Sequence, residues 1–442
     1  MPRGSELKPD ARPPRTPPLP GIGVAAPFGI VGAYLVAALV AFLLTSLAFV
    51  GAADELARGG LAAPAVLLAV HLLALAFLPL AVGGAALHVL PVFLRSRPRP
   101  VRCGAALVGL CAGPLLAVGI ARAVDALTWS ALGVFALGLG LLLWEVASLV
   151  AGAPRGKLLV VSRFGVVAAG LNGALSVAVG GVLFSVQWRP WAGITHERLI
   201  AIHLHLAVLG CLTLLIVTVG RTLGPMLALA PAAPKRRLPV DELLIAVGTW
   251  VATLGLAGAS RAVVLVGTAL ALAGLVRFVA LLVRTARGRR TASLEAPLAH
   301  FLVGLVFLAQ AGVIGALLFA GRRAPAELAA YAVFLLLGWA AGVTLGHVGK
   351  LLSLSAWTWW PPGERPKQAA FFARRAWAIE AVAFAVGVEL LAVGALLERV
   401  VLARGGAVLL VLAAALALGG ALWTTWSPGR SGPGSGPGSV PA

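Results

Sequence analysis

The stretch HLLALAFLPLAVGGAALHVLP, residues 71 to 91, decides the fold of this chain. It contains no Asp, Glu, Lys or Arg, and its length matches the roughly 20 apolar residues that a helix needs to cross a bilayer. Because lipid offers no hydrogen-bond partners to a bare backbone, such a segment must satisfy its own backbone as a helix. A second stretch, HLAVLGCLTLLIVTVGRTLGP at residues 205 to 225, aligns with the first without gaps. The two stretches together predict repeated membrane-spanning helices.

The two stretches share a frame that their leucines alone do not explain. It consists of a histidine, a small residue and a proline at matching positions: His71, Ala76 and Pro91, then His205, Gly210 and Pro225. A weaker copy, GWAAGVTLGHVGKLLSLSAW at residues 338 to 357, has Val333 at the histidine position. The copies lie 134 and then 128 residues apart, close to one third of the apolar region. We interpret them as three arcs of four helices around a pseudo-threefold axis; the alternative is chance similarity among Leu- and Ala-rich helices.

The whole composition fits a membrane protein. Apolar residues make up 60% of the 442 residues and charged residues 11%, against about 45–50% and about 25% in soluble domains. The predicted fold class is therefore all-α, a polytopic membrane bundle of about twelve transmembrane helices within residues 25–425. The expected spans cover residues 27–50, 62–94, 102–121, 127–151, 157–186, 196–229, 240–259, 261–285, 293–320, 325–356, 368–397 and 399–424. Residues 1–24 and 426–442, rich in Pro, Arg, Gly and Ser, are expected to be disordered arms.

The loop charges predict the orientation. Basic residues are concentrated in alternate loops, and such loops stay on the cytoplasmic side. This pattern accounts for the net charge of +20, so we expect a lipid bilayer as the partner and no nucleic acid. The prediction is a multi-pass protein of the bacterial inner membrane with both termini inside. The cations that predict it include Arg3, Lys8, Arg95, Arg97, Arg99, Arg155, Lys157, Lys235, Arg236, Arg284, Arg287, Arg365 and Lys367.

The intramembrane histidines are functional candidates, because titratable groups in lipid are rare and costly. Depth along the predicted spans divides them into two groups. His71, His203 and His205 fall in the outer half, with His196 at the outer mouth. His88, His300 and His347 fall in the inner half. At 1.5 Å per residue, the first and last histidines of the second span are about 25 Å apart and cannot share a site.

The inner half contains a second candidate cluster. Glu380 lies at a depth where it can pair with His300, His347 or Lys350, and with His88 these groups make up a predicted inner polar cluster. Glu389, higher in the same span, can approach the outer histidines. Such groups can form a proton or ion path, or they can be pairs that neutralise each other, and the sequence slightly favours neutralisation.

The chain resembles subunit I of the heme–copper oxidase superfamily, and in particular its short bacterial branch. Three segments carry this resemblance: residues 71–91, the run HLHLAVLG from residue 203 continuing to residue 225, and GHVGKLLSLSAW at residues 346–357. The resemblance implies a heme site in the outer leaflet, with His71 at the position of a family ligand on the second helix. The family's copper ligands come from the sixth and seventh helices, yet residues 240–259 contain no His. The usual copper ligand set is therefore absent, and oxygen reduction is not expected.

The resulting hypothesis pairs His71 with His205 or His203 as the two axial ligands of a low-spin heme. Arg189, Arg198 and Arg399 at the outer mouth are candidate partners for heme propionates. The expected function is redox or electron transfer, with quinol or a periplasmic electron carrier as donor, and no catalytic residue is assigned. The alternatives are hydrogen-bonded packing histidines and an interfacial belt of arginines.

A second function class stays open. A membrane transporter or a protein that handles heme or copper can use intramembrane His and Glu as ligands or proton carriers. The run TVGRTLG, residues 218–224, is similar to a helix end in the NnrS family of heme- and copper-containing membrane proteins. Secondary transporters usually contain twofold repeats, whereas the repeat here is threefold, which favours the oxidase-like interpretation.

Overall fold

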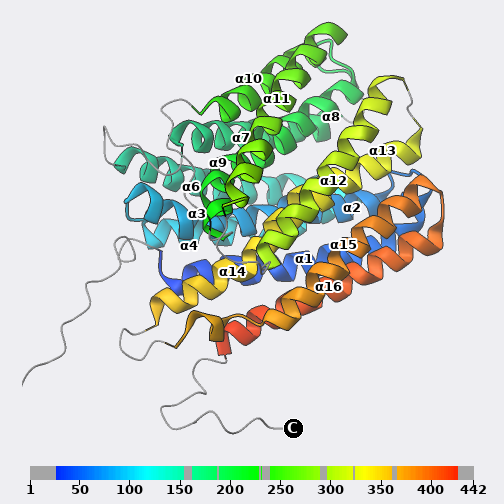
Figure 1. Cartoon of the computed structure of the whole chain (residues 1–442). Coiled ribbons are helices and arrows are strands. Elements are labelled where there is room, and N and C mark those ends of the chain that lie inside the picture. The colour runs from blue at the N-terminus through cyan, green and yellow to red at the C-terminus, as the bar shows by residue number, and fades with distance from the viewer. Residues whose placement is uncertain are drawn as a thin grey trace, which may run out of the picture.

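The apolar runs fold as helices, as the bilayer requires of them. The computed structural model describes residues 26–153, 162–186, 189–227, 230, 239–288, 296–321, 324–360 and 366–426. Twelve helices in this part of the chain are long and apolar enough to cross a membrane (Figure 1). Their bounds agree with the predicted spans to within a few residues, so the predicted all-α membrane bundle is confirmed. A lipid bilayer is therefore the environment of the protein.

The first arc contains four spans. They are α1 (Phe28–Ala57), then α2 (Pro64–Leu72), η2 (Leu73–Phe77) and α3 (Leu78–Leu94) as one span, then α4 (Pro100–Leu110) with α5 (Gly113–Arg122), and α6 (Asp125–Gly152). The third span bends between α4 and α5, where the backbone presses against the second span. A Cβ at Gly113 would lie 2.0 Å from the carbonyl oxygen of Leu75, so only glycine fits this contact.

The second and third arcs repeat this order. The second consists of α7 (Arg163–Val186), α8 (His196–Leu204) with η3 (His205–Thr213) and α9 (Leu214–Leu227), α10 (Val240–Ala257) and α11 (Arg261–Ala286). The third consists of α12 (Ala296–Phe319), α13 (Pro325–Ala332) with η4 (Val333–Ala341) and α14 (Gly342–Trp359), η5 (Gln368–Phe371), α15 (Arg374–Leu396) and α16 (Val400–Trp426).

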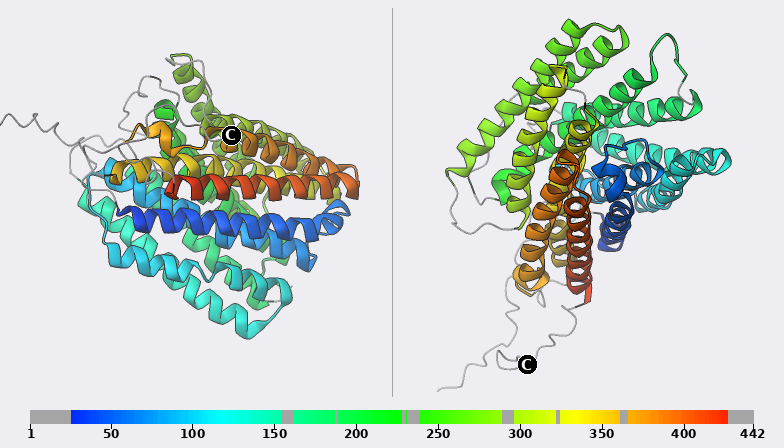
Figure 2. Two further views of the ribbon diagram at one scale, coloured as in Figure 1. Left: turned by 90° about the horizontal axis from the view of Figure 1, so that it is seen from below. Right: turned by 90° about the vertical axis from the view of Figure 1, so that its right-hand side faces the viewer.

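The second spans of the three arcs lie at the centre of the bundle. In each arc the second span packs against the first and the third, and α14 and η4 of the third arc also contact α3 and η3. The tenth span is the most enclosed, with 67% of its most apolar window buried, against 22% for α7 and for α11. The end-on view in Figure 2 shows the outer hairpins, such as α10–α11, projecting from this centre. The predicted arrangement in three arcs of four is thus confirmed.

Each central span contains a π-helix, and the three segments overlap in the aligned frame. η2 begins two residues after His71, η3 begins at His205, and η4 begins at Val333. A π-helix has i→i+5 hydrogen bonds and is common at functional sites. The small residues of the sequence frame lie inside these segments, where neighbours pack closely. A Cβ at Gly210 would lie 2.8 Å from Asn172, and one at Gly338 would lie 2.7 Å from Phe307.

The first and last helices close the ring. α16 packs along α1, and both views of Figure 2 show the red and blue helices side by side. At one end of this junction, the guanidinium of Arg404 donates to both carboxylate oxygens of Asp54 at 2.7 and 2.6 Å. Near the other end, the indole of Trp359 donates to the carbonyl oxygen of Ala26 at 3.1 Å.

The predicted terminal arms and several of the predicted inner cations lie outside the described residues. Among these cations are Arg155, Lys157, Lys235, Arg236 and Arg365. One boundary differs slightly, because α16 continues to Trp426, one residue into the predicted tail. The orientation of the bundle stays a prediction from the charges.

Candidate functional site

His71 lies in the last turn of α2, two residues before the π-helix of the second span. Its Nδ1 lies 2.7 Å from the carbonyl oxygen of Leu67. Because a carbonyl oxygen only accepts, Nδ1 must carry the hydrogen and donate it. Nε2 is then the nitrogen with a lone pair. Histidines that ligate metals usually donate their other ring N–H in this way, which fixes the tautomer and the ring orientation.

His205 repeats this arrangement in the second arc. Its Nδ1 lies 2.7 Å from the carbonyl oxygen of Ala201, four residues earlier, as Leu67 is for His71. His205 is also the first residue of η3. The shared histidine of the sequence repeat thus has the same hydrogen bond in both arcs, and its Nε2 has the lone pair in both.

His203 points toward the fifth span. Its Nδ1 donates to the carbonyl oxygen of Ser176 at 2.9 Å, and a Cβ at Gly180 would lie 3.2 Å from its ring. Residues 176 and 180 are both on α7, so this face of α7 holds the ring. Within the described part of the chain, no hydrogen bond involves Nε2 of His71, His203 or His205.

In the structure, the imidazoles of His71 and His203 interact electrostatically. No such interaction with another histidine is found for His205 among the described residues. The second and sixth spans that carry these rings do not pack extensively against each other in the described part of the chain.

The outer histidines do not gather into a centre with three protein ligands. Among the described residues, no group of three or more His, Cys, Asp or Glu side chains is close enough to hold a metal ion. His71, His203 and His205 together therefore do not form such a centre.

The candidate propionate partners belong to different groups of helices. Arg189 and Arg198 flank the start of α8, which packs against α7 and α10. Arg189 is exposed, and Arg198 is half-buried. Arg399 is exposed just before α16, on a hairpin that packs against α1. Arg404, near it, is already paired with Asp54. The three cations thus come from two separate hairpins, and their shared role toward propionates stays a prediction.

The inner half contains a buried ion-pair contact. Nε2 of His300 on α12 lies 2.8 Å from Oε2 of Glu380 on α15, and the two side chains are 1% and 0% exposed. This contact is one of the pairings named from the sequence. His347 on α14 interacts electrostatically with His300, and its Nδ1 donates to the carbonyl oxygen of Val343 at 2.6 Å.

The remaining members of the predicted inner cluster are Lys350 and His88. Lys350, on the turn after His347, has its ammonium 5.6 Å from the ring centre of Phe372. His88 is buried on α3, and its Nδ1 has no hydrogen-bond partner among the described residues. Glu389 does not approach the outer histidines; both its oxygens accept from the amide of Gln310 at 3.2 Å.

Several buried polar contacts are absent from the sequence prediction. Asn172 donates to the carbonyl oxygen of Gly210 inside η3 at 3.1 Å, and the indole of Trp339 in η4 donates to Thr213 in η3 at 3.0 Å. The first contact carries a signal in the sequence, since Asn172 is a polar residue within an apolar span. No pattern in the sequence indicates the second.

The arginine of the TVGRTLG run has a structural partner. Nη1 of Arg221 lies 2.8 Å from Asp241 and 3.8 Å from Glu242, both in the first turn of α10. This ion pair joins the inner ends of the sixth and seventh spans. This structural ion pair explains the presence of Arg221 in the span, so no bound ligand is needed to explain it.

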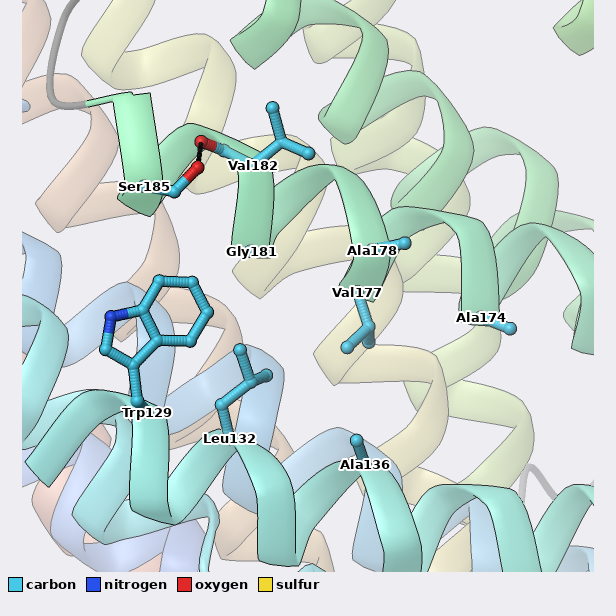
Figure 3. Close-up of a pocket in the computed structure, with 9 residues that line it drawn as sticks. All are labelled: Trp129, Leu132, Ala136, Ala174, Val177, Ala178, Gly181, Val182 and Ser185. Carbon is cyan, nitrogen blue, oxygen red and sulfur yellow. Dashed lines mark hydrogen bonds between the residues drawn. The ribbon is translucent and has the colours of Figure 1, made fainter. Parts of the chain in front are cut away.

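A groove of about 470 Å³ lies between α6 and α7 (Figure 3). Its lining comes from Trp129, Leu132, Ala136, Ala174, Val177, Ala178, Gly181, Val182 and Ser185. The hydroxyl of Ser185 donates to the carbonyl oxygen of Val182 at 2.8 Å, so it is already engaged. None of the candidate histidines lines the groove, and its walls are suited to apolar chains rather than to a metal.

Comparison with known proteins shows a likeness in structure but none in sequence family. No family model matches the sequence, and no curated protein matches it. Among solved structures, the chain is similar to a heme-copper terminal oxidase dimer solved by cryo-EM, with a TM-score of 0.57 and 12% sequence identity. The match covers 90% of this chain and 84% of the oxidase chain. At this identity the likeness establishes the fold alone: the protein is a twelve-helix membrane bundle with a distant oxidase-like fold.

Proposed function

We propose that the chain is a heme-binding protein of the bacterial inner membrane that transfers electrons without an active-site copper. His71 would supply one imidazole to the heme iron, and a histidine in the first part of the sixth span would supply a second. Of the two candidates, His203 is favoured over His205. The observation that carries the proposal is the shared geometry of the rings, since His71 and His203 each donate Nδ1–H to a backbone carbonyl and keep Nε2 available. Of the two sixth-span candidates, His203 is the one that interacts electrostatically with His71.

The donor set fits a heme iron. Two neutral imidazoles with available Nε2 lone pairs are the ligands of a low-spin heme, and a site with two protein ligands suits heme better than a copper centre with three or four. The loose contact between the second and sixth spans supports the same assignment, because a porphyrin has to lie between the helices that ligate it.

A low-spin heme, when bound, takes up and releases one electron. The residues of this chain supply its surroundings. The carbonyl oxygens of Leu67 and Ser176 fix the two rings and increase the basicity of Nε2. The apolar spans keep water away, which tunes the reduction potential together with the ligands. Quinol in the bilayer or a periplasmic electron carrier is the proposed electron donor.

A reduced-minus-oxidised spectrum of the purified protein from heme-replete cells tests this proposal. We expect a sharp α-band in the native protein and its loss in His71→Ala and in His203→Ala, because each change removes one axial imidazole. His205→Ala should retain the band. His88→Gln, which changes the other histidine of the second span, is the matched control and should also retain it.

Two results would contradict the proposal at different levels. A colourless protein from heme-replete cells rejects heme binding and favours a transporter or a heme- or copper-handling protein. Loss of the band in His205→Ala, with retention in His203→Ala, keeps the heme but rejects the favoured pair. Adding quinol or a reduced periplasmic cytochrome to the oxidised protein then identifies the donor from the rate at which the band appears.

A further inference from the structure

Three helices of the third arc enclose a cluster of titratable side chains that the proposed heme site does not use. His300 comes from α12, His347 from α14 and Glu380 from α15. His300 and Glu380 are in direct contact at 2.8 Å and are almost completely buried. His347 interacts electrostatically with His300. The cluster lies in the third arc, whereas the proposed heme ligands come from the first and second.

The fold makes room for this pair. A Cβ at position 346 would lie 2.3 Å from the Cβ of His300, so Gly346 is required where α14 passes α12. On the other side, the ring of Phe384 lies 5.3 Å from the ring of His300. The nearest atom is the Cβ of His300, so Gly346 allows α14 and α12 to approach closely whatever side chain stands at position 300. This close approach, together with the ring of Phe384, encloses the imidazole.

One oxygen of the carboxylate is left without a partner. Oε1 of Glu380 is buried and accepts no hydrogen bond from any described residue. Buried polar atoms are normally satisfied, and an exception calls for a water, an ion or a proton. A metal ion is a poor candidate, because among the described residues these groups do not form a set of three that could hold one. A proton, with or without a water, needs no such set.

Charge balance then limits the cluster to one proton. With Glu380 ionised and both imidazoles neutral, the cluster has a buried negative charge, and one added proton makes it neutral. A second proton would leave a net positive charge among apolar side chains, which is costly in a low dielectric. The proton can reside on the carboxylate or on His300 across the same hydrogen bond. An Arg–Glu pair lacks this property, because the guanidinium does not release its proton.

The His300–Glu380 pair lies only a short distance along its helices from their first residues, at the end of the bundle that the charges predict to be inside. His300 is four residues from the first residue of α12, and Glu380 is six residues from the first residue of α15. At 1.5 Å per residue these depths are about 6 and 9 Å. Other titratable or charged groups on the elements packed around the cluster are Tyr34, Asp54, Glu55, His88, Arg221, Glu327, Tyr331, Lys350, Arg374, Arg375, Glu389 and Arg404. Of these, Lys350 lies one turn from His347 on the same helix.

We propose that His300, Glu380 and His347 form a buried proton-binding site that exchanges one proton with the aqueous phase at the inner end of the bundle. The ligand is a proton, and the site does not depend on heme. It differs from a fixed neutralising pair because its charge changes when the proton leaves.

Infrared spectroscopy of the full-length protein in lipid nanodiscs tests this proposal. A protonated carboxylic acid has a separate carbonyl stretching band, which shifts when its hydrogen is replaced by deuterium. On acidification we expect such a band to appear and to shift in D2O. Glu380→Gln should abolish it. Glu389→Gln, which changes the other glutamate of α15, is the matched control and should leave the titrating band unchanged.

The histidine variants separate a proton site from a static contact. His300→Gln keeps a hydrogen-bond donor for Glu380 but cannot hold the proton, so the midpoint of the titration should move by at least one pH unit, about tenfold in proton affinity. His347→Gln should also move the midpoint, because it removes the second imidazole. Each variant is compared only if it elutes as a single species and unfolds at the native temperature. A native protein in which neither the protonated-carboxyl band nor the imidazole ring bands titrate, or a titration that is unchanged in Glu380→Gln, overturns the proposal whether or not heme is bound.

Discussion

At the scale of single residues, the backbone positions the candidate histidines. His71, His205 and His347 each donate Nδ1–H to the carbonyl four residues earlier, and His203 donates to the neighbouring helix. Each ring is therefore held in one tautomer by a contact that needs no second side chain. A chain composed so largely of apolar residues can in this way orient imidazoles without further buried polar groups.

Gly346→Ala tests how tightly the inner histidine is seated. The added methyl group overlaps His300, so we expect a lower free energy of unfolding by about 1–3 kcal/mol, the usual cost of overpacking. Thermal unfolding in detergent measures the loss. The control is Gly133→Ala, where no atom lies within 4 Å of the new Cβ and the better helix propensity of alanine should raise stability slightly. Equal stability in both variants would show that α12 and α14 can separate without cost, because the methyl group meets the backbone-fixed Cβ of His300.

The sequence predicted some of these residue contacts and not others, for a physical reason. Depth follows from position along a span, so Glu380 and His300 could be placed at the same level, and they are in contact. Rotation about the helix axis is poorly defined in spans that are apolar on every side. Glu389 was accordingly expected near the outer histidines, whereas it faces Gln310.

At the scale of elements, the π-helices are the feature that distinguishes the central spans. η3 and η4 each contain nine residues, and all three segments fall on the aligned frame of the repeat. Hydropathy cannot reveal a change from i→i+4 to i→i+5 hydrogen bonding, because these segments are apolar on every side in either form. The repeat could be recognised in the sequence, whereas its structural meaning could not.

Asn172→Leu tests whether the π-helix of the sixth span depends on a neighbouring donor. The change removes the hydrogen bond to the carbonyl of Gly210 with little change in size. We expect a loss of stability of about 1 kcal/mol, within the range measured for hydrogen bonds between membrane helices. Thermal unfolding measures it. Thr268→Val is the control, because that hydroxyl bonds only to its own exposed helix. If both variants unfold at the native temperature, η3 is stable without Asn172.

At the scale of the whole molecule, the arcs and their charges predict the orientation. Reporter fusions measure this directly, because alkaline phosphatase is active only outside the cytoplasm and a fluorescent protein fused to the chain folds only inside it. A fusion after Trp426 should be fluorescent, and a phosphatase inserted at Ala192 should be active, because the charges place these points on opposite sides. Each position receives the other reporter as its control. The reverse pattern would show that the basic loops do not set the topology.

The contact between α1 and α16 has a consequence for how such a protein can arise. Because the two ends of the apolar chain already lie side by side, nothing in the packing identifies one arc as the beginning. A gene that encoded the same arcs in rotated order, second, third and first, would specify the same neighbours. The cyclic arrangement of the helices, rather than the linear order of the arcs, therefore defines which helices pack together.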